Sequence, residues 1–249
     1  MGKKIGNLLI GEGMPKICVP LTGVTLHELL DECRLASESD VDLVEWRVDF
    51  FEYALDFKKV LAALPQIKSA LGDCPLLFSF RTKEEGGEKS IEVDQYISLN
   101  KEVIASGAVD AIDIELFRGR AVVTELVETA KLHQVTTVIS NHDFKGTPSI
   151  EEMVRRMGDA VELGGDIPKL AVMPKNEDDV LSLLQASLQL KRKYQNNPLI
   201  MIAMGGIGTV SRFSGEIFGS AVTFASLKNA SAPGQISVQY MKTILKVIH

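Results

Sequence analysis

The sequence predicts an α/β fold, specifically a single (β/α)8 TIM barrel that spans residues 1–249 as one domain. Eight short apolar runs alternate with longer helical patterns along the chain. The runs recur about every 30 residues, the interval that a strand, a helix and their connections require. A doubly wound open sheet would usually carry a glycine-rich phosphate loop after its first strand, and none follows residues 16–21. The pattern therefore favours a closed barrel.

The strands are predicted, in chain order, at 16–21, 43–48, 76–81, 111–116, 136–142, 169–173, 199–203 and 221–224. Helices are predicted at 26–36, 94–106, 122–133, 150–163, 177–194 and 237–248. Thr25, Ser149 and Asn176 precede three of these helices, and such side chains commonly cap a first helical turn. Residues 4–15 come before the first strand, where we expect a short hairpin that closes the bottom of the barrel.

Composition narrows the functional class. The 249 residues are 45% apolar and 24% charged, with a formal net charge of −6, which excludes disorder, collagen-like repeats and a disulfide scaffold. The chain has no apolar run of about 18 residues and no secretory core behind its first charges, so we expect a cytoplasmic protein without a membrane partner. Three cysteines without metal-ligand spacing fit reduced thiols. The absence of a basic stripe argues against nucleic acid as the main partner.

Polar pairs interrupt several predicted strands near their ends. Strands of a parallel barrel are buried on both faces and should read as nearly continuous apolar runs. Residues two apart share a face of a strand, and this barrel's active sites lie at the carboxyl ends of the strands. Five strands carry such groups: Glu45 with Arg47, Ser79 with Arg81, Asp113 with Glu115, Ser140 with His142, and Lys169.

These charges have two interpretations. They could form a structural network of ion pairs at the barrel mouth, as buried charges often do. Alternatively they form a site in which Lys169 is the key group, because an amine taken out of water loses proton affinity and can become a nucleophile. If strands five and six are neighbours, His142 can reach the same small ligand. An amine beside an imidazole base is suited to Schiff-base formation followed by proton abstraction.

Six segments in register resemble the type I 3-dehydroquinate dehydratase family. They are residues 45–49 (Glu-Trp-Arg-Val-Asp), 80–88 (Phe-Arg-Thr-Lys-Glu-Glu-Gly-Gly-Glu), 140–144 (Ser-Asn-His-Asp-Phe), 167–169 (Ile-Pro-Lys), 204–212 (Met-Gly-Gly-Ile-Gly-Thr-Val-Ser-Arg) and 231–235 (Ser-Ala-Pro-Gly-Gln). The resemblance implies a syn elimination of water from 3-dehydroquinate to give 3-dehydroshikimate in the shikimate pathway, with no metal and no cofactor.

The resemblance also implies roles for individual residues. Lys169 would form the imine with the C3 ketone, His142 would move the C2 proton, and Glu85 would orient the imidazole. Glu45, Arg47 and Arg81 would hold the ring hydroxyls, and Asp113 would order the layer beneath them. The substrate carboxylate would be bound by Arg212, Ser231 and Gln235. Residues 226–236 look like a lid over the substrate, and the family resemblance adds a homodimer.

Three other functions compete with this hypothesis. A class I aldolase would share the lysine and the fold, but should carry a phosphate-binding loop after strands seven and eight. That region instead presents Arg212 and Gln235, which suit a carboxylate. A sugar-acid binding protein would not need both Lys169 and His142. In a purely structural barrel all these charges would merely pair.

Overall fold

The chain forms an eight-stranded parallel barrel, which confirms the predicted fold class. The computed structural model describes residues 2–39, 41–227 and 231–249. The barrel strands are β3 (Lys16–Leu21), β4 (Leu43–Arg47), β5 (Leu76–Ser79), β6 (Ala111–Glu115), β7 (Thr136–Asp143), β8 (Ile167–Val172), β9 (Ile200–Ala203) and β10 (Val222–Phe224). They pair in the order β10-β3-β4-β5-β6-β7-β8-β9. A single parallel bridge between Leu199 and Ser220 joins β9 to β10 and nearly closes the barrel.

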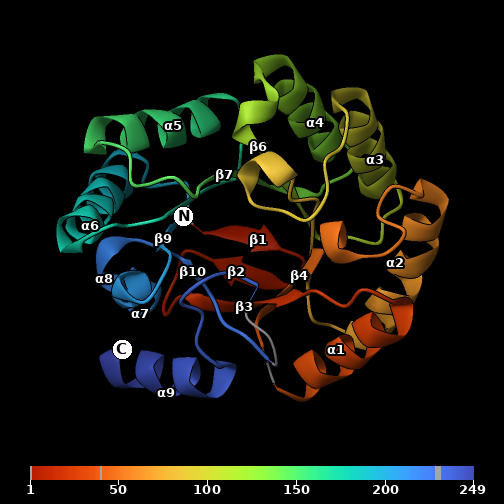
Figure 1. The fold of residues 1–249 in the computed structure, drawn as a ribbon, viewed down its shortest axis with the longest axis horizontal. Coiled ribbons are helices and arrows are strands. Elements are labelled where there is room, and N and C mark those ends of the chain that lie inside the picture. The colour runs from red at the N-terminus through yellow and green to blue at the C-terminus, as the bar shows by residue number, and fades with distance from the viewer. Residues whose placement is uncertain (1, 40, 228–230) are drawn as a thin grey trace.

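Helices surround the strands on the outside, as Figure 1 shows. They are α1 (Leu26–Glu38), α2 (Phe57–Leu71), α3 (Val93–Ala105), α4 (Arg120–Leu132), α5 (Ile150–Glu162), α6 (Glu177–Lys193), α7 (Val210–Phe213), α8 (Gly215–Phe218) and α9 (Val238–Ile248). The three predicted caps hold, because Thr25, Ser149 and Asn176 each accept a hydrogen bond from the first turn. Within the described ranges, none of the helices has the length and apolar character that spanning a membrane requires.

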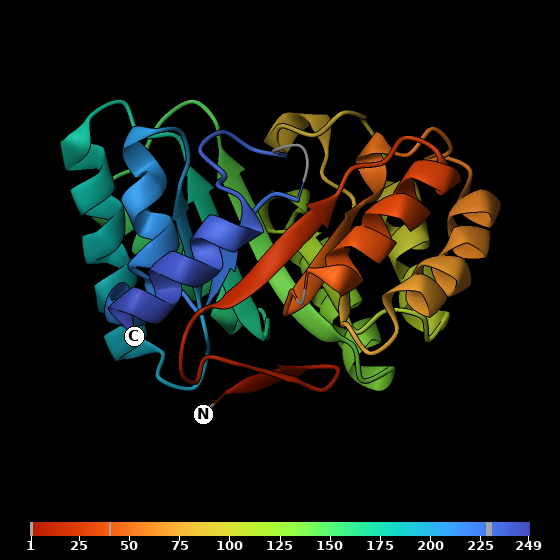
Figure 2. The same cartoon turned by 90° about the horizontal axis from the view of Figure 1, so that it is seen from below.

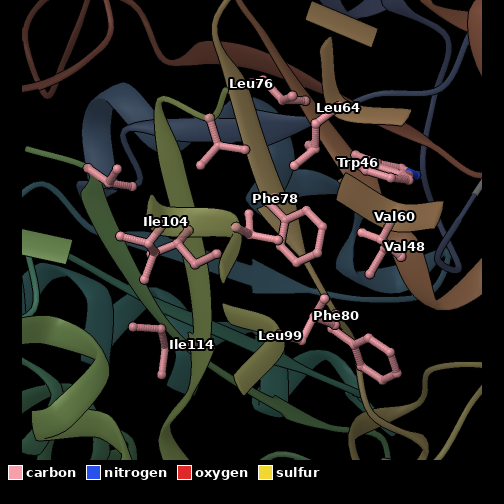
Figure 3. Close-up of a cluster of buried hydrophobic side chains, with 14 of the residues drawn as sticks. Trp46, Val48, Val60, Leu64, Leu76, Phe78, Phe80, Leu99, Ile104 and Ile114 are labelled. Atoms are coloured by element: carbon pink, nitrogen blue, oxygen red, sulfur yellow. The ribbon is translucent and has the colours of Figure 1, made fainter. Parts of the chain in front are cut away.

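The outer faces of the strands pack against these helices and orient the polar residues inward. Phe78 of β5 lies edge-on to Trp46 of β4, with ring centroids 5.6 Å apart. Figure 3 shows both in a buried apolar cluster that includes Leu76 and Phe80. Because neighbouring residues of a strand face opposite sides, Ser79 then faces the barrel interior. Burial of the apolar side chains thus fixes which polar groups point inward.

An antiparallel hairpin closes the lower end of the barrel, as predicted. Its strands are β1 (Lys3–Ile5) and β2 (Leu8–Ile10). The side chains of Ile5 and Ile10 are buried against the lower interior residues of the barrel strands, Val222 among them. Figure 2 shows the hairpin across the end opposite to the loops that follow the strands.

Four predicted strands are too long at their carboxyl ends, and one of them, 169–173, exceeds β8 by the single residue Met173. Val48 and Leu116 lie in 3₁₀ turns, Val48–Phe50 and Leu116–Arg118, and the third strand ends at Ser79 rather than at Arg81. The apolar pattern continues past each strand because Val48 and Leu116 still pack into the outer cluster. Hydrophobicity therefore marks burial here, while the backbone already turns toward the next helix.

Candidate active site

A cavity lies at the mouth of the barrel, where the strands end. Residues from both ends of the sequence meet there, together with the apolar side chains of Phe144, Met204 and Phe224. All nine predicted site residues line this cavity: Glu45, Arg47, Arg81, Glu85, His142, Lys169, Arg212, Ser231 and Gln235. The structure thus gathers residues separated by up to 190 positions, 45 to 235, around one space.

Lys169 extends from β8 into the barrel interior and is 4% exposed. Its Nζ donates hydrogen bonds to Glu45 Oε1 at 3.1 Å and to Asp113 Oδ2 at 3.4 Å. The ring of Phe224 lies 4.5 Å from Nζ. The amine is therefore held at the floor of the cavity between two carboxylates and an aromatic face.

A layer of ion pairs lies beside this lysine. The Arg81 guanidinium reaches Asp113 Oδ1 at 2.8 Å and Glu115 Oε1 at 2.8 Å. It also donates to Ser140 Oγ at 3.0 Å, and Ser140 donates to Asp113 Oδ1 at 2.6 Å. Arg81 and Lys169 lower the pKa of Asp113, although its burial acts in the opposite direction. The charges that interrupt the strands thus pair with one another, and Arg81 of this layer lines the cavity.

His142 lies on β7, next to the strand that carries Lys169. In the register of the two strands Ser140 is opposite Lys169. His142 is opposite Ala171, two residues nearer the mouth of the barrel. The imidazole Nδ1 lies 3.0 Å from Glu85 Oε2, so Nε2 is the ring nitrogen that Glu85 does not engage. Burial lowers the pKa of His142 well below its usual value, and nearby Arg81, Lys169 and Arg47 lower it further. A neutral imidazole can accept a proton on Nε2 when its own proton is on Nδ1.

Glu85 ends the 3₁₀ turn Lys83–Glu85 and is buried beneath the histidine. Its Oε2 also accepts from the backbone N–H of His142 at 2.9 Å, and its Oε1 accepts from the Asn141 amide at 3.0 Å. Burial raises the pKa of Glu85 to about 8, and the neighbouring Glu115 carboxylate adds to this shift. The proton between Glu85 and His142 is therefore shared by a closely coupled pair.

Arg212 is the cation of the cavity that lacks an acidic partner within the described residues. Its Nη1 and Nη2 donate to the carbonyl oxygens of Phe224 at 3.4 Å and Pro233 at 2.8 Å. Among residues 2–39, 41–227 and 231–249, the buried Nε finds no hydrogen-bond partner. Burial lowers the pKa of the guanidinium to about 10, so it still carries its charge at neutral pH. A buried, uncompensated guanidinium is suited to a carboxylate anion.

Ser231 and Gln235 lie beside Arg212 and bond to each other. The Ser231 backbone N–H donates to Gln235 Oε1 at 2.9 Å, and Gln235 Nε2 donates to Ser231 Oγ at 3.1 Å. Gly234 has a φ of +77°, and a Cβ there would lie 2.3 Å from the carbonyl oxygen of Gly205. Glycine is thus required for this close approach. Of the predicted lid at 226–236, residues 228–230 lie outside the described residues.

Asp49 supports the cavity residue Arg47, a role that the sequence analysis did not assign to it. It is fully buried and binds Arg47 through two hydrogen bonds, from Nε at 2.8 Å and from Nη2 at 2.7 Å. It also accepts from the backbone N–H of Glu88 at 3.1 Å, which ties the loop after β5 to β4. The sequence did hold a signal for this pair, since Arg47 and Asp49 are opposite charges two residues apart.

The comparisons with known proteins agree with this geometry. The family model for type I 3-dehydroquinase matches residues 17–249. The 3-dehydroquinate dehydratase of Clostridium botulinum strain Eklund 17B is 49% identical over 246 residues, 99% of this chain and 97% of that protein. The crystal structure of the type I 3-dehydroquinate dehydratase from Clostridium difficile superposes with a TM-score of 0.97 at 46% identity, covering 100% and 98% of the two chains. The chain therefore belongs to the type I 3-dehydroquinase family.

Proposed function

We propose that this protein is a hydro-lyase that converts 3-dehydroquinate to 3-dehydroshikimate through a Schiff base on Lys169. The observation that carries the proposal is the meeting, in one cavity, of a buried amine, a mostly buried imidazole and the Arg212 guanidinium, which has no acidic partner among the described residues. The relatives described above bear the name of the same dehydratase. The shikimate pathway is the place of this reaction in the family.

In the proposed mechanism, the Lys169 amine adds to the C3 ketone and water leaves to give a protonated imine. The imine withdraws electrons and acidifies the C2 proton, which His142 Nε2 removes to give an enamine. The enamine electrons then expel the C1 hydroxyl, which leaves as water with the proton from His142. Hydrolysis of the new imine releases 3-dehydroshikimate and restores the free amine, so one water is lost per turnover.

The other cavity residues would hold the substrate during these steps. We assign the carboxylate to Arg212, Ser231 and Gln235, because all three line the cavity and Arg212 Nη2 donates to the Pro233 carbonyl of the segment that carries the other two. We assign the ring hydroxyls to Glu45, Arg47 and Arg81. The paired carboxylates around these two arginines keep both guanidinium groups fixed, so they lose little freedom on binding.

Replacement of Arg212 by alanine is expected to raise KM for 3-dehydroquinate about 10- to 100-fold, the range for loss of a hydrogen-bonded charge. The effect on kcat should be smaller, because the carboxylate is bound throughout the reaction. Steady-state kinetics would measure both constants, with the exposed Arg192→Ala as the matched control. An unchanged KM in Arg212→Ala would exclude the carboxylate assignment.

The direct test of the function combines two measurements on the purified protein. The conjugated enone of 3-dehydroshikimate absorbs in the ultraviolet, so its formation from 3-dehydroquinate can be followed as an absorbance increase. Borohydride added with the substrate should reduce the imine, and mass spectrometry of the peptides should place the added mass on Lys169. Turnover without a trapped adduct would refute the imine. Reaction with a phosphorylated aldol donor in place of 3-dehydroquinate would instead favour an aldolase.

We also propose a single-domain, cytoplasmic homodimer whose partners are small molecules. The family resemblance supports the dimer, and light scattering during gel filtration would measure its mass. The cysteines support a reducing compartment: Cys18 and Cys33 are buried, and burial raises the pKa of the Cys33 thiol to about 12.

A further inference from the structure

Asn141 links the catalytic histidine to a helix on the outside of the barrel. It is 1% exposed and lies on β7 between Ser140 and His142. Its Nδ2 donates to Glu85 Oε1 at 3.0 Å, and its Oδ1 accepts from Arg156 Nη1 of α5 at 2.9 Å. A continuous chain of hydrogen bonds therefore runs from Arg156 through Asn141 and Glu85 to His142.

The two end groups of this chain fix the orientation of the Asn141 amide. A guanidinium can only donate hydrogen bonds, and an ionised carboxylate can only accept them. The amide oxygen must therefore face Arg156, and the amide NH₂ must face Glu85. If the amide were rotated by 180°, its NH₂ would face the Arg156 donor and its oxygen would face the Glu85 carboxylate, and neither pair could form a hydrogen bond. Arg156 therefore determines that the Asn141 NH₂ donates to Glu85.

Arg156 is itself held firmly. Its Nε donates to Glu152 Oε1 at 2.8 Å, and its Nη1 reaches Asp143 Oδ2 at 3.2 Å. The guanidinium lies over the ring of Phe117, 5.1 Å from the centroid, and its side chain is 12% exposed. The neighbouring Arg155 also binds Glu152 but is 57% exposed, and its described partners are Glu152 and Asp159. Arg155 thus provides a matched control on the same helix.

The position of one proton decides whether His142 can act as a base. Glu85 Oε2 faces Nδ1 of the ring at 3.0 Å. When Glu85 is ionised, Nδ1 carries the proton and Nε2 has a free lone pair. When Oε2 is protonated it donates to Nδ1, and the neutral ring then carries its proton on Nε2, which cannot accept another.

We propose that Asn141 and Arg156 are positioning residues that favour the ionised form of Glu85 and so extend to lower pH the range in which the imidazole has a free Nε2. This inference rests on the proposed function in one respect, the use of His142 as the base. A donor to Oε1 stabilises the carboxylate form, and it opposes the burial that raises the pKa of Glu85.

Other charges also act on Glu85, and the proposed effect adds to theirs. Arg81 Nη1 from the end of β5 lies 3.7 Å from Oε2 and favours ionisation. The groups that face Glu85 are Arg81 from the segment after β5, Asp113 and Glu115 from β6, His142 from β7 and, through Asn141, Arg156 from α5. The two β6 carboxylates and burial favour protonation, Arg81 and the Asn141 amide act against them, and the net pKa of Glu85 remains raised.

The proposal predicts a shift in the pH profile of kcat/KM. Asn141→Leu removes the donor, raises the pKa of the Glu85–His142 pair, and should move the acidic limb about one unit to higher pH. On the acidic side this shift lowers kcat/KM about tenfold at a given pH, whereas kcat/KM at high pH should approach that of the wild type. Arg156→Met should move the limb in the same direction, Arg156→Lys should move it less, and Arg155→Met should leave it in place.

A purely structural role would lower activity equally at all pH values and leave the limb where it is, and that result would overturn the proposal. Because Asn141 is buried, the partly exposed Arg156 variants supply the same test if Asn141→Leu does not fold. Nitrogen NMR of the His142 ring supplies a readout that does not depend on turnover. At any one pH across the acidic limb, it should show a larger fraction of the Nδ1–H tautomer in the wild type than in Asn141→Leu.

Borohydride trapping separates failure of this inference from failure of the proposed function. Asn141→Leu should still form the adduct on Lys169, since the amine and its two carboxylates do not contact Asn141. An untrapped wild-type protein would refute the function itself. A trapped wild type with an unchanged tautomer and an unchanged pH limb in the variants would refute only the role of Asn141 and Arg156.

Discussion

Replacement of Lys169 by arginine is expected to reduce kcat for 3-dehydroquinate by on the order of 10⁴-fold or more, the scale on which loss of a covalent nucleophile acts. Arginine keeps a positive charge between Glu45 and Asp113, but its guanidinium does not lose a proton and cannot form the imine. The variant should therefore fold and remain inactive.

Lys169→Ala provides the comparison for this experiment. It also lacks the amine, but it leaves the buried Glu45 carboxylate without its described cationic partner, which typically costs about 3–5 kcal/mol of stability. Thermal unfolding should thus separate the two variants, while borohydride should label neither. Turnover by Lys169→Arg within 100-fold of the wild type would show that the reaction does not pass through this amine.

Replacement of His142 by alanine is expected to lower kcat by about 10²- to 10⁴-fold, the usual contribution of a general acid–base group. The amine of Lys169 remains in place, so the imine should still form, although more slowly. Because proton removal from C2 would then limit the rate, the imine should accumulate during turnover.

Mass spectrometry of samples quenched with borohydride at successive times would measure this accumulation. The exposed His133→Ala is the matched control and should behave as the wild type. An undiminished kcat in His142→Ala would show that another group moves the proton. If both the trapped adduct and kcat were lost, His142 would be required for imine formation rather than for a later step.

The barrel could be predicted because its signals are local. Each strand is a short apolar run, and the spacing of the runs reports the intervening helices. The helix α2 was not among the predicted helices, since it carries Pro65 in its interior, a residue that normally ends a helix. No helix was predicted between the last two barrel strands, β9 and β10, because two short helices of four residues each, α7 and α8, lie there.

The site could be predicted in part because its residues interrupt apolar strands. Lys169 and His142 stand out as polar groups where the fold demands burial, and the family resemblance supplied Glu85, Arg212 and Gln235. The pairing of Arg47 with Asp49 and the contact of Arg156 with Asn141 could not be read from the sequence. Both depend on how a loop or an outer helix packs against the barrel, which spacing along the chain does not specify.

The β1–β2 hairpin determines from which end of the barrel small molecules can enter and leave. Ile5 and Ile10 seal the end of the barrel away from Lys169, so in the described part of the chain the reactants reach the amine from the opposite end. Three water molecules take part: one leaves when the imine forms, one is eliminated from the ring, and one later cleaves the adduct. All three must then pass through the same opening as the substrate. Departure of product and arrival of the next substrate are thereby forced to alternate.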